Sequence, residues 1–296
     1  MSILKMRLIV LIERLKKVTL VAQELGMKQP TVSFHMKKLE EEWGMPLFEH
    51  KTGKVLLTEA GRLLHRYALQ IDRSYSEAAA RMEKLRTSGK HTARIGCTPL
   101  AGAALLTASW FERISGNEGM MCEIAEGTHS ELIAAMEEGR IDLVLTGLEP
   151  AESHYHREML VETPIAAVVP AACAGEEGEP LSAMLHKGFT YIALDDPSVE
   201  DRLMAANAAE FAWLRQEMRL GAVAILLNAV RAGNAFTVMP AAAALSEKKA
   251  AEGTAVVPLP GKSALWQAYA VWPRNHWNPQ LPLKLVQTLR RGAFAN

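Results

Sequence analysis

The apolar positions of the first 43 residues recur three and four residues apart, which predicts short amphipathic helices. The inward positions of the first and third helices share this spacing: Leu8, Leu11, Ile12 and Leu15, then Val32, Met36 and Leu39. A second helix is expected over residues 19–25, with Gly26 as the turn that follows it. Pro30 suits the first turn of the third helix, where its missing N–H costs nothing. Two helices joined by a glycine-containing turn make a helix-turn-helix.

Two further elements follow these helices. Residues 47–57 have Thr52-Gly53 at their centre, with Lys51 and Lys54 beside it, and predict a wing hairpin. The proline-free segment 59–88 should form one helix of about 30 residues, roughly 45 Å long. Its apolar residues form a heptad seam: Leu64, Ala68, Ile71, Tyr75, Ala78, Met82 and Leu85. The narrow seam favours pairing with a second copy of the chain, and packing on its own domain is the alternative.

Beyond residue 90, short β-branched runs alternate with helical stretches. The expected strands cover residues 94–96, 121–125, 141–145, 165–169, 191–194, 235–239 and 266–272. The expected helices cover 101–114, 130–138, 181–186, a long stretch ending at 215, 222–232 and 281–291. Repeated βα order implies a mostly parallel sheet with helices on its faces. We expect two α/β subdomains with a crevice between them.

Charge divides the chain although its formal net charge is zero. Residues 1–90 hold 17 Lys+Arg and 10 Asp+Glu, a net charge of +7, and the remainder carries −7. Residues 1–90 should therefore be attracted to a polyanion. The alternative is that these charges only form a solvated basic helix surface. Cys97, Cys122 and Cys173 are too widely spaced for a disulfide framework or a thiolate metal site, so buried reduced thiols are expected, with a redox role for Cys97 as the weaker alternative. The chain shows neither a membrane span nor a signal-peptide pattern, so a cytoplasmic protein is expected.

The third helix leaves polar side chains outward or at its leading end. Glutamine can bond adenine N6 and N7, serine and threonine can contact bases or phosphates, and lysine neutralises phosphate. The second helix of a helix-turn-helix places its N-terminal residues on base edges. The candidate DNA-binding residues are Gln29, Pro30, Thr31, Ser33, Phe34, His35, Lys37 and Lys38, with Lys51 and Lys54 of the wing. A helix cap at Gln29 and ordinary surface charge for the lysines are the alternatives.

Residues 21–61 resemble the N-terminal domain of LysR-type transcriptional regulators over a long ungapped stretch. The residues that carry the resemblance are Gln29, Pro30, Val32 and Ser33 at the start of the recognition helix, Leu47-Phe48 at the wing, and Leu57-Thr58-Glu59-Ala60-Gly61 at the linker helix. Further along, residues 230–240 are similar to a late Val-x-x-Gly-x-Gly-x-x-x-x-Pro signature, with Ala235 in place of the second glycine. Phe34 and His50 stand where the family commonly has arginine, so those contacts do not carry over. Phe34 either touches a thymine methyl or packs.

The resemblance implies an α+β multidomain protein. It would have a winged helix-turn-helix over 1–58, a linker and dimerisation helix over 59–89, and an α/β periplasmic-binding-protein-like effector domain over 90–296. The two subdomains of the effector domain would cover about 90–162 with 267–296, and about 163–266. The family also implies a dimer or tetramer on double-stranded promoter DNA, a small-molecule effector, and RNA polymerase as a further partner. Neither a cofactor nor a membrane partner is expected.

Ligands of open α/β sheets bind outside the carboxyl ends of strands. The loops there supply the candidate effector-binding residues Thr98, Pro99, Leu100, Thr128, Thr146, Asp196, Ser198 and Arg202. The commoner role of each single serine or threonine is a helix N-cap worth about 1 kcal/mol, so the convergence of the loops carries the prediction. Apart from Arg202 these loops hold no arginine, and an anionic effector would rely mainly on backbone N–H groups. His154-x-His156 lacks a third ligand and predicts a surface loop rather than a zinc site.

Two other functions compete with transcription regulation. An enzyme built on the α/β part would need a nucleophile or a perturbed acid/base pair, and no such motif is present in the sequence. A solute-binding module with a helical front would need export. We therefore expect a ligand-responsive, sequence-specific DNA-binding regulator that is not an enzyme.

Overall fold

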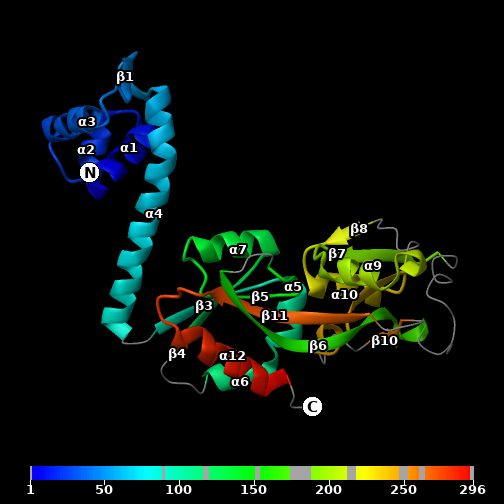
Figure 1. Cartoon of the computed structure of the whole chain (residues 1–296). Coiled ribbons are helices and arrows are strands. Elements are labelled where there is room, and N and C mark those ends of the chain that lie inside the picture. The colour runs from blue at the N-terminus through cyan, green and yellow to red at the C-terminus, as the bar shows by residue number, and fades with distance from the viewer. Residues whose placement is uncertain are drawn as a thin grey trace. The chain divides into compact units, whose positions relative to one another are not determined.

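The structure of the chain is a computed structural model that describes residues 2–88, 91–115, 120–150, 154–173, 188–211, 218–246, 253–259 and 264–293. The chain forms two compact units, Met1–Lys90 and His91–Asn296 (Figure 1). Each unit has its own hydrophobic core. No helix in the described ranges is long and apolar enough to cross a membrane.

Three helices pack around the core of the first unit: α1 (Ile3–Leu15), α2 (Val18–Glu24) and α3 (Gln29–Trp43). Gly26, at φ +64°, makes the left-handed turn between α2 and α3, a conformation that glycine adopts without steric cost. Pro30 lies in the first turn of α3. Ile12, Val32 and Leu39 are fully buried, so the apolar stripes face inward as predicted. The helix-turn-helix is confirmed.

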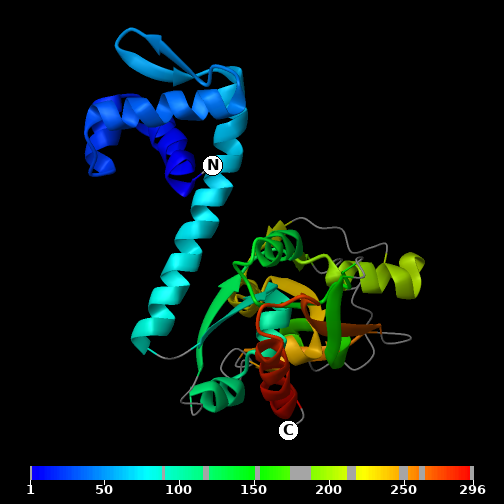
Figure 2. The same cartoon turned by 60° about the vertical axis from the view of Figure 1, so that its left-hand side comes forward.

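The wing is a two-stranded antiparallel hairpin formed by β1 (Phe48–Lys51) and β2 (Lys54–Leu57). Thr52 and Gly53 both have positive φ, 48° and 71°, as a tight two-residue hairpin turn requires. The Val55 N–H donates to the Lys16 carbonyl at 2.8 Å, which fixes the hairpin to the end of α1. Figure 2 shows the hairpin beside α3 and the start of α4.

The long helix α4 (Glu59–Ser88) has 30 residues, as predicted. Leu64 and Ala68 are buried in the core of the first unit, and Ile71 packs against that core. Tyr75 and Met82 are 50% and 68% exposed. Ala78 is also exposed, and the Leu85 side chain lies outside the described residues. The first three positions of the seam therefore pack within the chain, as the alternative interpretation held. Only the later positions are open to a partner, and their pairing stays a prediction.

The second unit is built on a nine-stranded sheet in the described ranges, with the order β4-β3-β5-β11-β6-β9-β7-β8 and with β10 paired to β6. Its strands are β3 (His91–Cys97), β4 (Met120–Glu126), β5 (Leu143–Thr146), β6 (Tyr155–Pro170), β7 (Thr190–Leu194), β8 (Met218–Leu220), β9 (Ala235–Pro240), β10 (Thr254–Pro258) and β11 (Leu265–Pro273). β3 is parallel to β4 and β5, and β7 is parallel to β8 and β9. β6 and β11 are antiparallel and run side by side from the part that carries α7 to the part that carries α9 and α10 (Figure 1).

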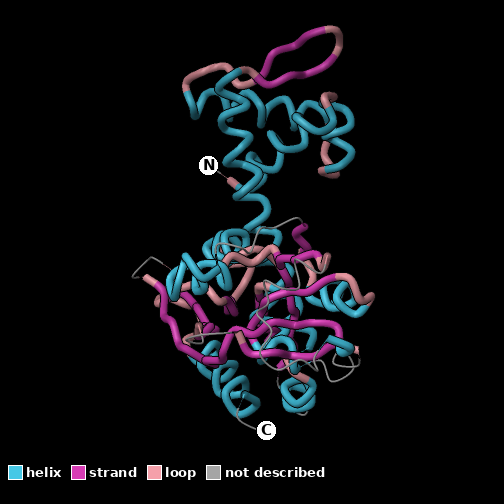
Figure 3. Tube along the Cα trace, turned by 90° about the vertical axis from the view of Figure 1, so that its right-hand side faces the viewer, coloured by secondary structure: helices cyan, strands magenta, loops and turns pink. Residues whose placement is uncertain are grey.

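Helices cover both faces of this sheet (Figure 3). They are α5 (Pro99–Leu105), α6 (Ala108–Ser115), α7 (His129–Glu137), α9 (Ser198–Phe211), α10 (Val223–Arg231), α11 (Ala241–Ser246) and α12 (Gln280–Ala293), with a short 3-10 turn at Ala171–Cys173. Trp110 of α6 and Leu285 of α12 pack in one core cluster with Trp272. Leu132 of α7 packs in a separate cluster with Val271, the neighbour of Trp272 on β11. Adjacent residues of a strand point to opposite faces, so the two clusters lie on opposite sides of the sheet.

The structure corrects several predicted elements. The sheet is mixed rather than mostly parallel, because β6 and β11 run antiparallel to their neighbours. The predicted helix over 101–114 is two helices, since Leu106 leaves the helical conformation at φ −89° and ψ 62°. The sequence pattern also misses β8, β10, α11 and the first half of β6. The helix expected over 181–186 and the end of the stretch to 215 lie outside the described residues.

Candidate DNA-reading helix and effector site

The leading turns of α3 present one polar surface to solvent. Its exposed residues, termed here the reading face, are Gln29, Pro30, Thr31, Ser33, Phe34, Lys37 and Lys38. His35 is half-buried, and its Nδ1 is buried without a hydrogen-bond partner among the described residues, so His35 lies at the border of the reading face. The helix thus separates inward apolar residues from outward polar residues as their spacing predicts.

Phe34 is the apolar member of the reading face and is 56% exposed. The Lys38 Nζ lies 5.9 Å from the centre of its ring, and the His35 ring stands edge-on at 5.7 Å. Lys38 also pairs with Glu41 at 2.7 Å, and this hydrogen bond raises the pKa of Lys38. Phe34 therefore does not pack in the core, and its ring is open to solvent beside Lys38.

One residue that the sequence pattern does not indicate joins α3 to the wing. Glu40 Oε1 accepts hydrogen bonds from the N–H groups of Leu47 and Phe48, at 2.8 and 3.1 Å. At the wing tip, Lys54 is exposed, and Lys51 is exposed but paired with Glu49 at 2.9 Å. The wing is thus held in a fixed relation to the reading face.

Polar groups gather where β3, β4 and β5 end and α9 begins. We term them the carboxyl-end cluster: Thr98, Thr128, His129, Thr146, Asp196 and Ser198. The Thr98 N–H donates to the Leu145 carbonyl at 2.9 Å, and Thr146 Oγ1 lies 2.9 Å from His129 Nδ1. A Cβ added to Gly147 would lie 2.6 Å from both Ser198 Oγ and Trp266 Nε1, so the start of α9 closes onto the end of β5. The structure therefore brings together loops that are far apart in the sequence.

Two members of this cluster keep polar atoms without partners. Trp266 Nε1 donates to Ser198 Oγ at 2.8 Å, and the Ser198 N–H donates to Asp196 Oδ1 at 3.1 Å. In contrast, Asp196 Oδ2 and Thr98 Oγ1 are buried and have no hydrogen-bond partner among the residues that the structure describes. Burial lowers the pKa of His129, and the charge of Asp196 opposes that shift.

The other predicted effector residues have structural roles. Thr128 forms a capping box with Glu131, whose Oε2 accepts from the Thr128 N–H at 3.0 Å, so the N-cap alternative describes this threonine. Pro99 and Leu100 begin α5 and are buried. The Arg202 guanidinium donates to Gln267 at 3.0 Å and to Tyr269 at 3.3 Å. His129, Gly147 and Trp266 are not among the residues predicted from the sequence, and only the position of His129 beside Thr128 could have drawn attention to it.

The thiols differ from the expectation of three buried cysteines. Only Cys97 is buried, while Cys122 is half-buried and Cys173 is exposed, and all three are free. Burial, together with the nearby charge of Glu126, raises the pKa of Cys97 to about 12. A thiol with such a pKa is protonated at neutral pH, whereas reactive thiols have lowered pKa values. The redox alternative for Cys97 is therefore not supported.

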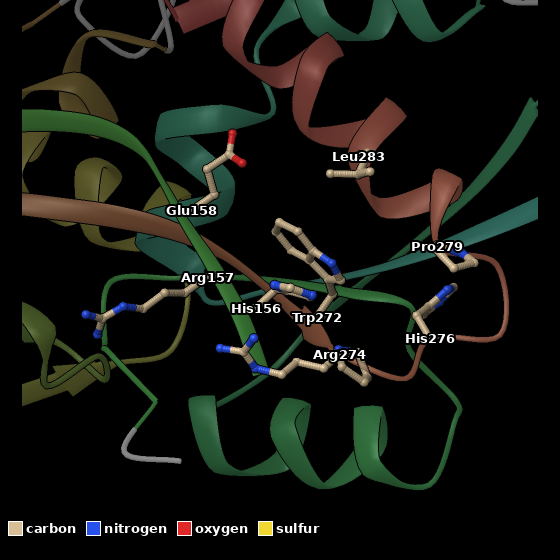
Figure 4. A pocket seen from close by; sticks show the side chains of 9 residues that line it. His156, Arg157, Glu158, Trp272, Arg274, His276, Pro279 and Leu283 are labelled. Atoms are coloured by element: carbon tan, nitrogen blue, oxygen red, sulfur yellow. The ribbon is translucent and has the colours of Figure 1, made fainter. Parts of the chain in front are cut away.

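A hollow of about 300 Å³ lies where β6 begins and β11 ends (Figure 4). It is lined by His156, Arg157, Glu158, Trp272, Pro273, Arg274, His276, Pro279 and Leu283. His156 belongs to β6 and faces Trp272 with 5.5 Å between ring centres, so it is not in a surface loop. Among the residues in the described ranges, no group of three or more His, Cys, Asp or Glu side chains is placed to hold a metal ion.

Both units match known protein families. Residues 3–62 match the model described as "Bacterial regulatory helix-turn-helix protein, lysR family", and residues 87–293 match "LysR substrate binding domain". The RuBisCO operon transcriptional regulator of Allochromatium vinosum is 27% identical over 243 residues, which cover 80% of this chain and 79% of that protein. The regulator CitR of Bacillus subtilis is 27% identical over 149 residues, about half of each chain.

Full-length solved structures share the fold. An OxyR mutant from Corynebacterium glutamicum has a TM-score of 0.59 at 21% identity and covers 99% of this chain and 91% of its own. CbnR in complex with its target DNA has a TM-score of 0.55 at 16% identity, with coverage of 99% and 100%. The chain therefore belongs to the LysR family of transcriptional regulators, whose members join a helix-turn-helix that binds promoter DNA to a domain that binds a small-molecule effector, and which form oligomers.

Proposed function

We propose that this regulator recognises its promoter through the reading face of α3. The observation that carries the proposal is the exposure of Gln29, Thr31 and Ser33 at the leading turns of the second helix of the helix-turn-helix. Residues at this place contact base edges in such motifs. Gln29 suits adenine, Thr31 and Ser33 suit bases or phosphates, and Phe34 suits a thymine methyl. Pro30 fixes the start of the helix, and His35 contributes from the border.

Lysines of α3 and the wing supply the contacts with phosphate. Lys37 and Lys54 are exposed, and Lys38 and Lys51 would exchange Glu41 and Glu49 for phosphate when DNA binds. The net charge of +7 over residues 1–90 supports this assignment. Neutralised phosphates release counterions, so binding should weaken steeply with salt.

The effector is proposed to bind between the two α/β parts of the second unit, at the carboxyl-end cluster. Thr98, Thr146, Asp196 and Ser198 are the proposed contacts. Pro99, Leu100 and Thr128 would hold the loops in place, and Arg202 would border the site through Gln267 and Tyr269. The effector controls DNA binding if it favours one arrangement of the parts over another. β6 and β11, which are continuous through both parts, are suited to carry such a change.

Two copies are proposed to pair through the exposed positions of α4, namely Tyr75, Ala78 and Met82. The proposed domains are residues 1–58, 59–89 and 90–296, with subdomain boundaries near 163 and 267. A dimer would present two reading faces to a roughly palindromic site, and RNA polymerase would be its further partner at the promoter. Such a regulator acts in the cytoplasm, where the chromosome lies. The relatives are transcriptional regulators, which favours regulation over catalysis.

The test uses the full-length chain and duplex DNA selected from a random-sequence pool. Between 50 and 200 mM salt, the affinity for a selected site should fall by roughly 10³–10⁵ if each protein makes about 6–10 phosphate contacts. Gln29→Ala should lower the affinity by about 5- to 150-fold, the equivalent of a lost bidentate base contact. Gln70→Ala, an exposed glutamine on α4, is the matched control and should leave the affinity unchanged. Binding without sequence preference, or equal losses in both variants, would refute the proposal.

A further inference from the structure

Asp196 is a buried carboxylate that uses only one of its two oxygens. The residue is 4% exposed. Its Oδ1 accepts the Ser198 N–H at the start of α9, whereas its Oδ2 is buried without a hydrogen-bond partner in the described part of the chain. A helix cap needs one acceptor oxygen, so an asparagine would cap α9 equally well. A buried charged oxygen that lacks a donor is unfavourable. Capping of α9 therefore does not explain why residue 196 is an aspartate, with a second carboxylate oxygen, rather than an asparagine.

A second buried polar group in the same cluster, the Thr98 hydroxyl, also lacks a partner among the described residues. Thr98 is 3% exposed, and its Oγ1 is buried. Thr98 follows β3, and its N–H donates to the Leu145 carbonyl of β5. The next residue of β5, Thr146, contacts His129. A Cβ added to Gly147, which follows Thr146, would lie 2.6 Å from Ser198 Oγ, and the Ser198 N–H donates to Asp196. The two oxygens without partners therefore belong to one region. Buried polar groups are nearly always hydrogen-bonded, so two such groups in one region point to a bound molecule that supplies the partners. The carboxylate oxygen of Asp196 requires a donor, whereas the Thr98 hydroxyl can donate or accept.

No cation of the described chain neutralises Asp196. Arg219 pairs with Asp195 and Glu200, at 3.6 and 3.1 Å. Arg202 donates to Gln267 and Tyr269. Burial favours the neutral form of His129. In addition, Asp196 Oδ1 occupies the Ser198 N–H, one of the free N–H groups at the start of α9 that could otherwise hold an anion. The region is therefore poorly suited to a carboxylate or phosphate.

We propose that the effector of this regulator carries a protonated amino group that donates to Asp196 Oδ2, and a second polar group that forms a hydrogen bond with the Thr98 hydroxyl. This proposal rests on the proposed function of the carboxyl-end cluster as the effector site. An ammonium group forms charge-assisted hydrogen bonds with a carboxylate and compensates its buried charge. An anionic effector would instead meet Asp196 as a like charge. The effector class is thus a small amine, not an organic acid.

Asp196→Asn separates this role from helix capping. The substitution keeps an oxygen that can accept the Ser198 N–H, removes the charge, and replaces Oδ2 by a donor. The protein should fold with an unchanged or slightly higher Tm. Asp195→Asn is the matched control, because Asp195 is the exposed neighbour and pairs with Arg219.

The measurement is the Tm of the full-length protein with methylamine, putrescine, agmatine and lysine, and with acetate, succinate and glutarate at equal ionic strength. An amine at about 100 times its Kd should raise Tm by roughly 5–10 °C in the wild type and in Asp195→Asn. It should have no effect on Asp196→Asn. Stabilisation by acids only, by neither class, or by amines in Asp196→Asn overturns the proposal. Selective DNA binding is measured in the same preparation. If that binding is intact while the amine results are negative, only the amine proposal fails and the proposed promoter recognition stands.

Discussion

Phe34 is the residue whose chemistry departs most from the arginine that is common at this place in LysR-type regulators. An aromatic ring cannot donate to a phosphate or to guanine. It can contact the C5-methyl group of thymine, which is the apolar feature of the major groove. Phe34 stands exposed between Lys38 and His35 on the reading face. We therefore expect Phe34 to contact a thymine in the promoter, at a position where regulators with an arginine here would make other contacts.

Deoxyuridine tests this contact because it lacks only the methyl group. When thymines of a selected site are replaced one at a time, one replacement in each half-site should lower the wild-type affinity by about fourfold, from roughly 0.8 kcal/mol per buried methyl-sized group. Phe34→Ala should bind the thymine and deoxyuridine sites equally. Phe111→Ala, an exposed aromatic residue on α6, should still discriminate between them. Equal binding of all duplexes by the wild type would exclude the methyl contact.

Helical spacing alone predicts that Gln29, Ser33 and Phe34 face outward together, because local periodicity decides which side of a helix is buried. The state of Asp196 could not be predicted in the same way. Its unsatisfied oxygen depends on which donors are already taken, and these come from distant positions: Ser198 Oγ is occupied by Trp266, 68 residues away. Pairings over such distances are set by the sheet order, which leaves no local pattern in the sequence.

At the scale of elements, the junction between the wing and α4 depends on a single glycine. A Cβ added to Gly61 would lie 2.2 Å from the Leu47 carbonyl oxygen and 3.1 Å from Leu57 Cβ. The same junction is closed by Thr58, whose Oγ1 donates to the Pro46 carbonyl and accepts the Gly61 N–H. The close approach of α4 to the wing therefore requires the absence of a side chain at residue 61.

Gly61→Ala should destabilise the first unit by about 1–3 kcal/mol through overpacking, and should weaken DNA binding because the wing shifts relative to the reading face. Chemical denaturation followed by far-UV circular dichroism measures the first effect, and anisotropy with selected DNA measures the second. Gly221→Ala is the control, since an added Cβ there meets nothing within 4 Å and the φ is not positive. A Gly61→Ala protein as stable and as active as Gly221→Ala would show that the junction tolerates a side chain.

The predicted elements that were right are those with a strong local signal, and α4 is the clearest case. The first half of β6 gave no such signal, because His156 and Arg157 are exposed and the run is polar. Its place as a strand comes from pairing with β11, where Trp272 lies opposite His156. β8 has only three residues, too few for a periodic pattern. Tertiary pairing rather than intrinsic preference makes these strands.

At the scale of the molecule, the division of charge and the seam of α4 favour an assembly in which two basic units meet one DNA duplex. A single reading face covers one half-site, so high affinity requires two faces held together. Linking two modest contacts raises the overall affinity by roughly 10²–10⁴, provided that both are engaged at once. Within the described chain, Tyr75, Ala78 and Met82 are the seam positions open to a partner.

Introducing charge at Tyr75 and Met82 together, as Tyr75→Glu and Met82→Glu, should separate the copies because buried like charges at a helix pair are strongly unfavourable. Sedimentation equilibrium should show a shift toward monomer. The affinity for the complete selected site should fall by about 100-fold or more, while the affinity for an isolated half-site stays the same. Leu245→Glu, at an exposed apolar residue of α11, serves as the control for added charge. A double variant that remains dimeric would place the interface elsewhere, and equal losses on half-sites and complete sites would indicate damage to the reading face rather than loss of pairing.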